Sequence, residues 1–457
     1  FSDSKLILSN NLKIKNMKTN LTIINLLFFA ILFGQDGVST GSYGMFQSNG
    51  LNSYNESGML NERMIIVEDF VNYHKHNLKV PENSKPILSI DYDNALLKDK
   101  FVLQIGLATP YKDKLPKTSK QVNVSLVIDN SGSMSGGKME FVKNALIAFI
   151  NELENGTNVS IIVFNNDAEI RQNNVKLASD RSSVHQIIST IYASGSTNIN
   201  SGMLLGYNEI MKVHKQGMNS RLILLTDGMT NTGEVNHEII LANSKRFNDE
   251  GIEISTIGVG QSIDFDLLRN LAENGRGSNH FIGDSEKDIQ KVFINEVESL
   301  LYNLGKETKV TVEFPSGYKI AKTYGYKPVY ESDHKVSVHL ENLNSGTTQV
   351  ILMKVEADKI QDLKISAHLE YKVDGKIIQQ KETLKYNSTN KKSTNAEISK
   401  NYSIAFMADA LKEYAGEFVK GGNLTKTKIE ESLKFSENHT NVKDEDVKRM
   451  YELLKML

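Results

Sequence analysis

The stretch VNVSLVIDNSGSM, from Val122 to Met134, joins a short apolar run to a loop of small polar residues. The run has the length and the β-branched composition of a buried strand. Its last residues are followed by the spacing Asp-x-Ser-x-Ser, formed by Asp129, Ser131 and Ser133. Ligand sites of open α/β sheets lie where parallel strands end, so this stretch predicts both a strand and a binding loop.

The sequence downstream repeats this strand pattern. Between Asn123 and Tyr302, apolar runs of strand length alternate with amphipathic stretches of helical period, which is typical of a parallel sheet with helices on both faces. The further strand candidates are NVSIIVF, SRLILLT and IEISTIGV, and the helix candidates begin near Lys138, Ser182, Ser201, Asn236, Asp264 and Ser285. We therefore expect a Rossmann-like α/β domain.

Two more loops add oxygen-bearing side chains at the same predicted edge. The strand that ends at Leu225 leads into Thr226, Asp227 and Gly228, and a Gly-Ser-Thr loop between the two strands offers Thr197. Hard cations such as Mg²⁺ prefer oxygen ligands. We predict a metal shell that consists of Asp129, Ser131, Ser133, Thr197 and Asp227. If the hydroxyls bind directly and an aspartate binds through water, the ion stays electrophilic and attracts an acidic group of a partner.

The segments LVIDNSGSM, SGSTNINSGM and LILLTDGMTNTG resemble those of von Willebrand factor A (vWA) domains. The five residues match the metal-ion-dependent adhesion site of that family position by position. The resemblance implies a Rossmann-like fold that binds Mg²⁺ or Mn²⁺, and it does not imply catalysis. The helix candidate ERMIIVEDFVNYH, the flanking strands and the closing helices look like bacterial YfbK-type vWA proteins, which adds architecture and little function.

Composition narrows the classes of protein that are possible. The chain has 457 residues, 39% hydrophobic and 24% charged, which suffices for two or three packed cores. Its formal net charge of -2 is spread without long blocks, so we expect no nucleic-acid partner. Because the chain has no cysteine, disulfides, thiolate metal sites and cysteine nucleophiles are excluded.

Residues 1–34 are interpreted as an upstream stretch of 16 residues, left out of the fold, followed by an export signal that starts at Met17. The apolar run from Leu21 to Phe33 follows Met17 and Lys18 and is short for a membrane span, which suits a secretory signal whose start is Met17. Two alternatives for this run stay open: a buried helix and an uncleaved anchor. Only the anchor would bring the protein into contact with a membrane. Residues 35–59 are rich in Gly, Ser and Asn and are interpreted as a linker. We expect an extracytoplasmic protein in the periplasm, at the cell surface or outside the cell.

The remaining sequence predicts a vWA domain inserted into a β domain. Residues 60–119 hold a helix candidate and the strands ILSIDYD and KFVLQIGLA, residues 120–304 the vWA domain, and residues 305–390 a series of alternating strands typical of an antiparallel β-sandwich. Residues 395–457 return to helices. Integrin β chains resemble this plan, and by that analogy Glu286 to Asn303 is predicted to be a mobile helix that shifts on partner capture.

Three other patterns in the sequence do not indicate a catalytic, nucleotide-binding or metal site. The serines of the first loop lack a Gly-x-Ser-x-Gly elbow and a nearby His, which argues against a serine nucleophile. Gly258-Val259-Gly260 lacks the third glycine of a dinucleotide fingerprint. His74 and His76 have no third ligand nearby in sequence and are expected at the surface.

The function expected from these observations is metal-dependent binding of a protein that offers a carboxylate, without catalysis. Three alternatives stay open. The metal could stabilise the loops of a structural subunit of an envelope assembly, or the chain could regulate a separate enzyme. A hydrolase that uses the ion as a Lewis acid would need a base beside it, and the motif loops offer none beyond the coordinating aspartates.

Overall fold

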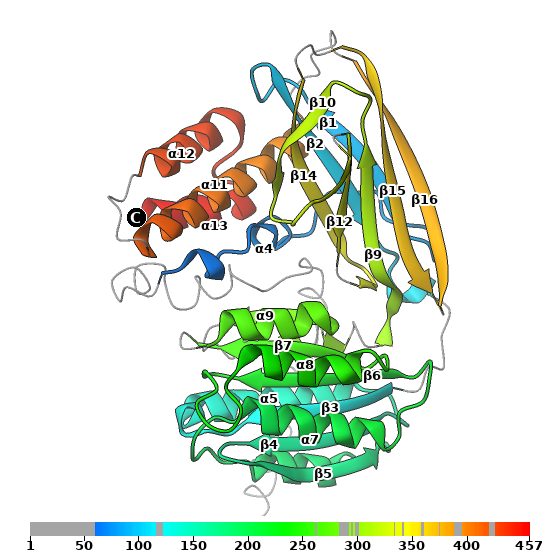
Figure 1. Ribbon diagram of the computed structural model, residues 1–457, viewed down its shortest axis with the longest axis vertical. Coiled ribbons are helices and arrows are strands. Elements are labelled where there is room, and N and C mark those ends of the chain that lie inside the picture. The colour runs from blue at the N-terminus through cyan, green and yellow to red at the C-terminus, as the bar shows by residue number, and fades with distance from the viewer. Residues whose placement is uncertain are drawn as a thin grey trace, which may run out of the picture. The chain divides into compact units, whose positions relative to one another are not determined.

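In the residues that it describes, the computed structural model contains three sheets and several groups of helices (Figure 1). Two of the sheets face each other as a sandwich, and the third is the centre of an α/β domain. The residues that the structure describes are 60–115, 122–260, 263–282, 292–293, 296–297, 301–332, 334–340, 342–357, 361–373, 375–387, 395–419 and 426–457.

The α/β domain is built on a six-stranded sheet with the order β5-β4-β3-β6-β7-β8. All neighbouring strands pair in parallel, except that β5 runs antiparallel to β4 at one edge. The strands are β3 (Val122–Asp129), β4 (Asn158–Phe164), β5 (Ala168–Lys176), β6 (Asn219–Thr226), β7 (Glu253–Val259) and β8 (Arg276–Ile282).

Helices cover both faces of this sheet, as the alternation of apolar residues predicts. Side chains of β3 point alternately into two separate cores, because successive residues of a strand face opposite sides: Leu126 and Ile128 pack with α5, and Val127 packs with α7. The helices are α5 (Gly137–Glu152), α6 (Ser182–Ser189), α7 (Ile199–Met211), α8 (His237–Asn248) and α9 (Phe265–Asn274).

The predicted α/β fold is confirmed, with two strands added to those expected. The sequence of β5, AEIRQNNVK, is polar because this edge strand lies largely exposed, so it gives no apolar run to detect. β8 contains RGSNHFI and is short of apolar residues in the same way. Most of the segment from Glu286 to Asn303, predicted to be a mobile helix, lies outside the described residues.

The second part of the fold is an antiparallel β-sandwich. One sheet has the order β1-β2-β14-β10, and the other has the order β11-β12-β9-β15-β16, with the short β13 paired to β9. The strands are β1 (Ile87–Asp93), β2 (Lys100–Ala108), β9 (Asn303–Glu313), β10 (Tyr318–Tyr324), β11 (Val329–Ser332), β12 (Lys335–His339), β13 (Leu343–Asn344), β14 (Thr348–Ala357), β15 (Leu363–Val373) and β16 (Lys376–Tyr386).

The α/β segment is inserted between strands of this sandwich. β2 precedes the α/β segment and pairs along its whole length with β14, which follows it. The apolar side chains of both sheets form one shared core, in which Phe101, Ile105 and Met353 of the first sheet meet Val310 and Leu369 of the second. The insertion expected from the order of the strands is therefore what the pairing shows.

Helices pack on the outer face of the four-stranded sheet (Figure 1). These are η1 (Glu62–Met64), α4 (Val67–Val71), α11 (Ala396–Val419), α12 (Thr427–His439) and α13 (Glu445–Lys455). Val102 of β2 and Val350 of β14 contribute to the core beneath them.

The helix expected from ERMIIVEDFVNYH is broken, which corrects the prediction from its spacing. Ile65 and Ile66 are extended and separate η1 from α4. Adjacent residues of an extended chain point to opposite sides. Ile65 therefore enters the core beneath α11, whereas Ile66 enters the α/β core. One helix could not place neighbouring side chains in two cores.

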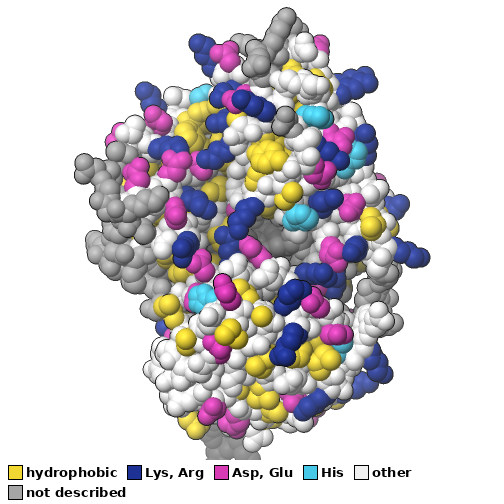
Figure 2. Space-filling view, in the orientation of Figure 1, with side chains coloured by type: hydrophobic (Ala, Val, Ile, Leu, Met, Phe, Trp, Pro, Cys, Tyr) yellow, Lys and Arg dark blue, Asp and Glu magenta, His cyan; other side chains and the backbone are white. Residues whose placement is uncertain are grey.

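In the part of the chain that the structure describes, none of the helices combines the length and the apolar character needed to cross a membrane. The apolar run from Leu21 to Phe33 lies outside the described residues. On the face shown in Figure 2, acidic and basic side chains are interspersed rather than gathered by sign.

Candidate metal centre

The predicted binding loops meet at the carboxyl edge of the α/β sheet. β3 and β6 are parallel neighbours in register, with Ile128 opposite Leu225, so the loops that follow them begin side by side. Asp129 ends β3, and Asp227 directly follows β6. The loop that comes second along the chain precedes α7 and carries Thr197, and the loop after β6 is the third.

Hydrogen bonds show how closely the five predicted residues approach one another. The Oγ atoms of Ser131 and Ser133 are 3.0 Å apart, and Ser133 Oγ donates to Asp227 Oδ1 at 2.7 Å. Thr197 is brought to the same place, because a Cβ atom placed on Gly228 would lie 3.5 Å from Thr197 Oγ1 and 4.0 Å from Ser133 Oγ. The structure therefore brings all five residues together.

Backbone contacts hold the three loops in register. Gly132 N–H donates to Gly195 O at 3.0 Å, which joins the first loop to the second. Thr197 N–H donates to Asn231 Oδ1 at 2.9 Å, and Asn231 N–H returns a bond to Thr197 O at 3.0 Å, which joins the second loop to the third. Gly195 has a φ of 80°, a conformation that favours glycine, and a Cβ there would meet Asn166 Oδ1 at 2.9 Å.

The two carboxylates lie at the floor of the site, and the hydroxyl of Ser133 lies at its exposed rim. Thr226 Oγ1 donates to Asp129 Oδ2 at 2.5 Å. Burial raises the pKa of Asp129 to about 6, hydrogen bonds from Thr226 and Ser131 oppose this shift, and the nearby Asp227 adds to it. Two buried carboxylates beside three hydroxyls form an oxygen-only donor set, which fits a hard divalent cation.

Two further residues complete the site and were not predicted. Thr226 orients Asp129, and Lys138, in the first turn of α5, places its Nζ 2.9 Å from Asp227 Oδ2. Both lie next to predicted residues or elements: Thr226 precedes Asp227, and Lys138 is the second residue of the helix after the first loop. Neither had a signal of its own, because Thr and Lys are common at such positions.

Large apolar side chains are exposed on the loops of this edge. Tyr192, whose carbonyl accepts a hydrogen bond from Asn130 Nδ2, is 68% exposed, and Met229, two residues beyond Asp227, is 57% exposed. Beside them, Asn130, Tyr192 and Ser194 line a hollow with Asp167 and Arg171. The metal edge thus offers apolar contacts, hydrogen-bonding groups and charges of both signs.

The expectation that His74 and His76 lie at the surface is wrong. Both imidazoles are buried, and Glu397, from the distant helix α11, lies beside them. Helical and strand patterns cannot show this proximity, because it depends on how α11 packs on the segment after α4.

Comparisons with known proteins agree with the α/β fold. The von Willebrand factor type A domain family matches residues 123–295. YfbK of Escherichia coli K12 is 27% identical over 302 residues, which are 64% of this chain and 51% of YfbK. The human inter-alpha-trypsin inhibitor heavy chain H4 is 29% identical over 253 residues, 52% of this chain and 27% of that protein. The chain thus spans about half of YfbK and less of the heavy chain.

A solved structure extends the similarity beyond the α/β domain. A von Willebrand factor type A protein from Catenulispora acidiphila superposes with a TM-score of 0.54 and 15% identity, and the match covers 82% of this chain and 91% of that one. At this identity the match concerns the fold alone.

Proposed function

We propose that the chain, whose residues 123–295 match the von Willebrand factor type A domain family, binds a partner protein through a divalent cation, Mg²⁺ or Mn²⁺. The cation is held by Asp129, Ser131, Ser133, Thr197 and Asp227. The observation that carries the proposal is the convergence of these five side chains, from three loops, at the edge where the parallel strands end.

The donor set favours capture of an acidic group. Ser131, Ser133 and Thr197 are neutral donors, and the charges of Asp129 and Asp227 are already engaged by Thr226, Ser133 and Lys138. A divalent cation in so weakly charged a shell retains affinity for one more anionic oxygen. Ser133, at the exposed rim, marks the side from which a partner's carboxylate would approach.

The surroundings of the site support docking. Exposed Tyr192 and Met229 flank the metal edge, and large amphipathic side chains of this kind are enriched at protein interfaces. Catalysis has less support: among the described residues, the ionisable side chains bonded within the donor set are the two aspartates and Lys138, all three bonded to one another or to hydroxyls. We also propose that the run from Leu21 to Phe33 exports the protein, which would place this surface outside the cytoplasm.

Metal binding is the first test. Calorimetric titration of the full chain with Mg²⁺ is expected to show one site, which Mn²⁺ should also occupy, and Ser133→Ala should weaken it at least tenfold because a direct ligand is lost. Ser135→Ala is the matched control, since Ser135 lies in the same loop, is exposed and is outside the donor set. Equal affinity in both variants would contradict the assignment.

Partner capture is the second test. The chain is immobilised and exposed to surface and secreted proteins, with Mg²⁺ and with EDTA in parallel. Proteins retained by the wild type in Mg²⁺, and lost both with EDTA and in Ser133→Ala, would support adhesion. An identical set under all conditions would leave a structural or regulatory role, in which the metal only stabilises the loops.

A further inference from the structure

A second cluster of potential ligands lies far along the chain from the metal edge of the α/β domain. It consists of His74 and His76, in the segment after α4, and Glu397, in the first turn of α11. One ligand atom from each of these residues lies within 4.8 Å of the others. The two imidazoles are buried, and the side chain of Glu397 is 20% exposed.

The tautomer of His76 is fixed by its neighbour Asn72. Asn72 Oδ1 accepts the N–H of Val350 at 2.8 Å, and its Nδ2 donates to Val350 O at 3.4 Å, so the amide cannot be reversed without losing both bonds. His76 Nε2 lies 2.9 Å from the same Oδ1 and must therefore carry the proton. The other nitrogen, Nδ1, is left with its lone pair.

That lone pair faces a carboxylate. His76 Nδ1 lies 3.5 Å from Glu397 Oε1, and two acceptors in this position repel each other unless a cation lies between them. Among the described residues, Nδ1 has no hydrogen-bond partner, and neither has His74 Nε2. Such buried groups left without a partner are costly and uncommon in native proteins.

Protonation of His76 Nδ1 would remove this repulsion, but burial disfavours the charged imidazole. Burial lowers the pKa of His76, and burial together with the neighbouring His76 lowers the pKa of His74 to about 3. A neutral imidazole is the form that binds metals. Protonating His74 as well as His76 would place two positive charges close together, and His74 Nε2 would still have no hydrogen-bond partner among the described residues.

We propose that His74, His76 and Glu397 bind a divalent transition metal, with Zn²⁺ as the preferred ion. Two imidazole nitrogens and one carboxylate are a common zinc donor set. Ligands at about 2.0–2.2 Å from a tetrahedral ion lie about 3.3–3.6 Å from one another. The distance of 3.5 Å between His76 and Glu397 already has this value.

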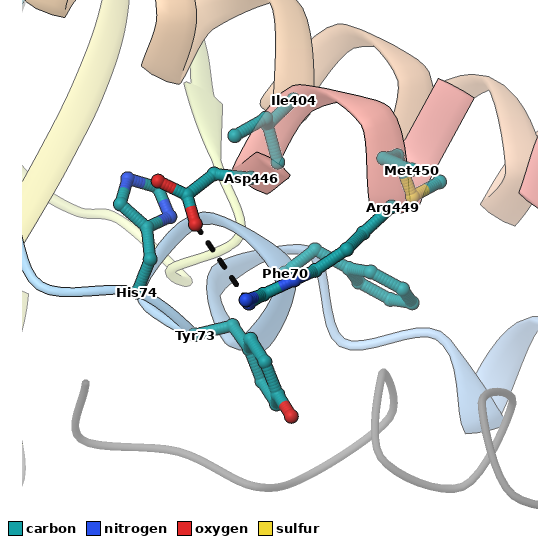
Figure 3. Close-up of a pocket in the computed structure, with 7 residues that line it drawn as sticks. All are labelled: Phe70, Tyr73, His74, Ile404, Asp446, Arg449 and Met450. Atoms are coloured by element: carbon teal, nitrogen blue, oxygen red, sulfur yellow. Dashed lines mark ion pairs between the residues drawn. The ribbon is translucent and has the colours of Figure 1, made fainter. Parts of the chain in front are cut away.

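The surroundings leave access for a fourth ligand. His74 borders a small pocket with Asp446, Arg449 and Tyr73 (Figure 3). In Figure 3 the carboxylate of Asp446 lies beside the His74 imidazole. Asp446 is engaged by Lys400 at 3.2 Å and by Arg449 at 3.7 Å. We therefore assign three protein ligands and leave the fourth position to water.

A metal here would join the segment after α4 to the C-terminal helices. That segment is already held at Glu397, whose Oε1 accepts the N–H of Asn77 at 3.2 Å, and at Thr348, whose Oγ1 accepts the N–H of His76 at 2.8 Å. Lys400 Nζ lies 3.9 Å from the other oxygen of Glu397 and leaves Oε1 directed at the imidazoles. The ion would thus hold this segment against α11 while its fourth position stays open to the pocket beside His74.

The test is zinc binding by the full chain in an Asp129→Ala background, which removes the α/β metal site from the measurement. After dialysis against Zn²⁺, elemental analysis is expected to give one ion per chain. Adding Glu397→Gln, which keeps the shape and the bond to Asn77, should weaken zinc binding about a hundredfold. His214→Gln is the control, since both ring nitrogens of His214 have partners, Ser220 Oγ at 2.8 Å and Glu250 O at 3.2 Å.

The coordination shell gives a second readout. X-ray absorption of the zinc form of Asp129→Ala is expected to show two imidazole nitrogens, and His74→Gln should reduce this to one. No bound zinc in Asp129→Ala, or zinc uptake that neither Glu397→Gln nor His74→Gln changes, would overturn the proposal. Failure here leaves the Mg²⁺ titrations of Ser133→Ala untouched, so the two sites are judged separately.

Discussion

The buried carboxylates at the two ends of the α/β sheet are compensated to different extents. Near the end where the strands begin, Arg221 of β6 contacts Glu253 of β7 at 2.5 Å and Glu296 at 3.1 Å. His280, further along β8, lies 2.9 Å from Glu296. At the metal edge, Asp129 and Asp227 are buried with hydroxyls and a single ammonium. One end is neutralised within the protein, and the other retains negative charge that a cation can compensate.

Arg221→Ala should produce the largest effect of the variants considered. It leaves Glu253 and Glu296 buried without their main cationic partner, which typically costs about 3–5 kcal/mol of unfolding free energy. Urea unfolding measures this loss, and Lys245→Ala is the control, since its pair with Asp249 is exposed and contributes little. Equal losses in the two variants would mean that the network does not stabilise the strand-start end.

Acid should weaken the same end of the sheet. Burial alone would raise the pKa of Glu296, but the hydrogen bond from His280 and the charge of Arg221 lower it to about 2 from the ordinary 4.5. A carboxyl with a lowered pKa contributes stability that is complete above about pH 4.5 and is lost as the pH falls toward 2. Unfolding free energy measured across this range should fall more steeply in the wild type than in Glu296→Gln; parallel curves would refute the assignment.

Thr226→Val probes the metal edge at constant side-chain shape. It removes the hydroxyl that holds Asp129 Oδ2 at 2.5 Å, and loss of such an orienting contact typically weakens metal affinity 10–100-fold. Calorimetric titration with Mg²⁺ measures the change. If Thr226→Val bound Mg²⁺ as the wild type does, the orientation of Asp129 would not matter to the site.

Lys138→Met should have the smallest effect, and it should be a gain. The ammonium lies 2.9 Å from Asp227 Oδ2 and repels an incoming cation, so its removal is expected to raise Mg²⁺ affinity about three- to tenfold. The gain should shrink as salt is added, because partly exposed charges are screened. A loss of affinity would show instead that Lys138 positions Asp227 for the metal.

The sequence predicted the elements whose apolar pattern is strong. The four inner strands of the α/β sheet are continuous apolar runs because both of their faces are buried, and this signal is local. β5 was not predicted because it is a polar edge strand. The break at Ile65 and Ile66 was not predicted because it depends on two cores that come together only in the folded chain.

The two candidate metal sites show the same limit. The five residues of the α/β site lie in loops whose positions follow from strand order, so spacing along the chain suffices to place them together. The sequence alone predicts His74 and His76 at the surface, because their neighbour Glu397 belongs to a helix far along the chain. No period or spacing connects segments whose proximity arises from helix packing on a sheet.

The insertion has a mechanical consequence. The α/β domain is joined to the sandwich through β2 on one side and β9 on the other, and these strands belong to different sheets. Ion pairs of β9 with the α/β domain, Lys306 with Glu253 and Arg276 with Glu307, add noncovalent connections. Tension applied by a partner at the metal edge would therefore divide between both sheets of the sandwich, so that neither strand alone would bear the full force.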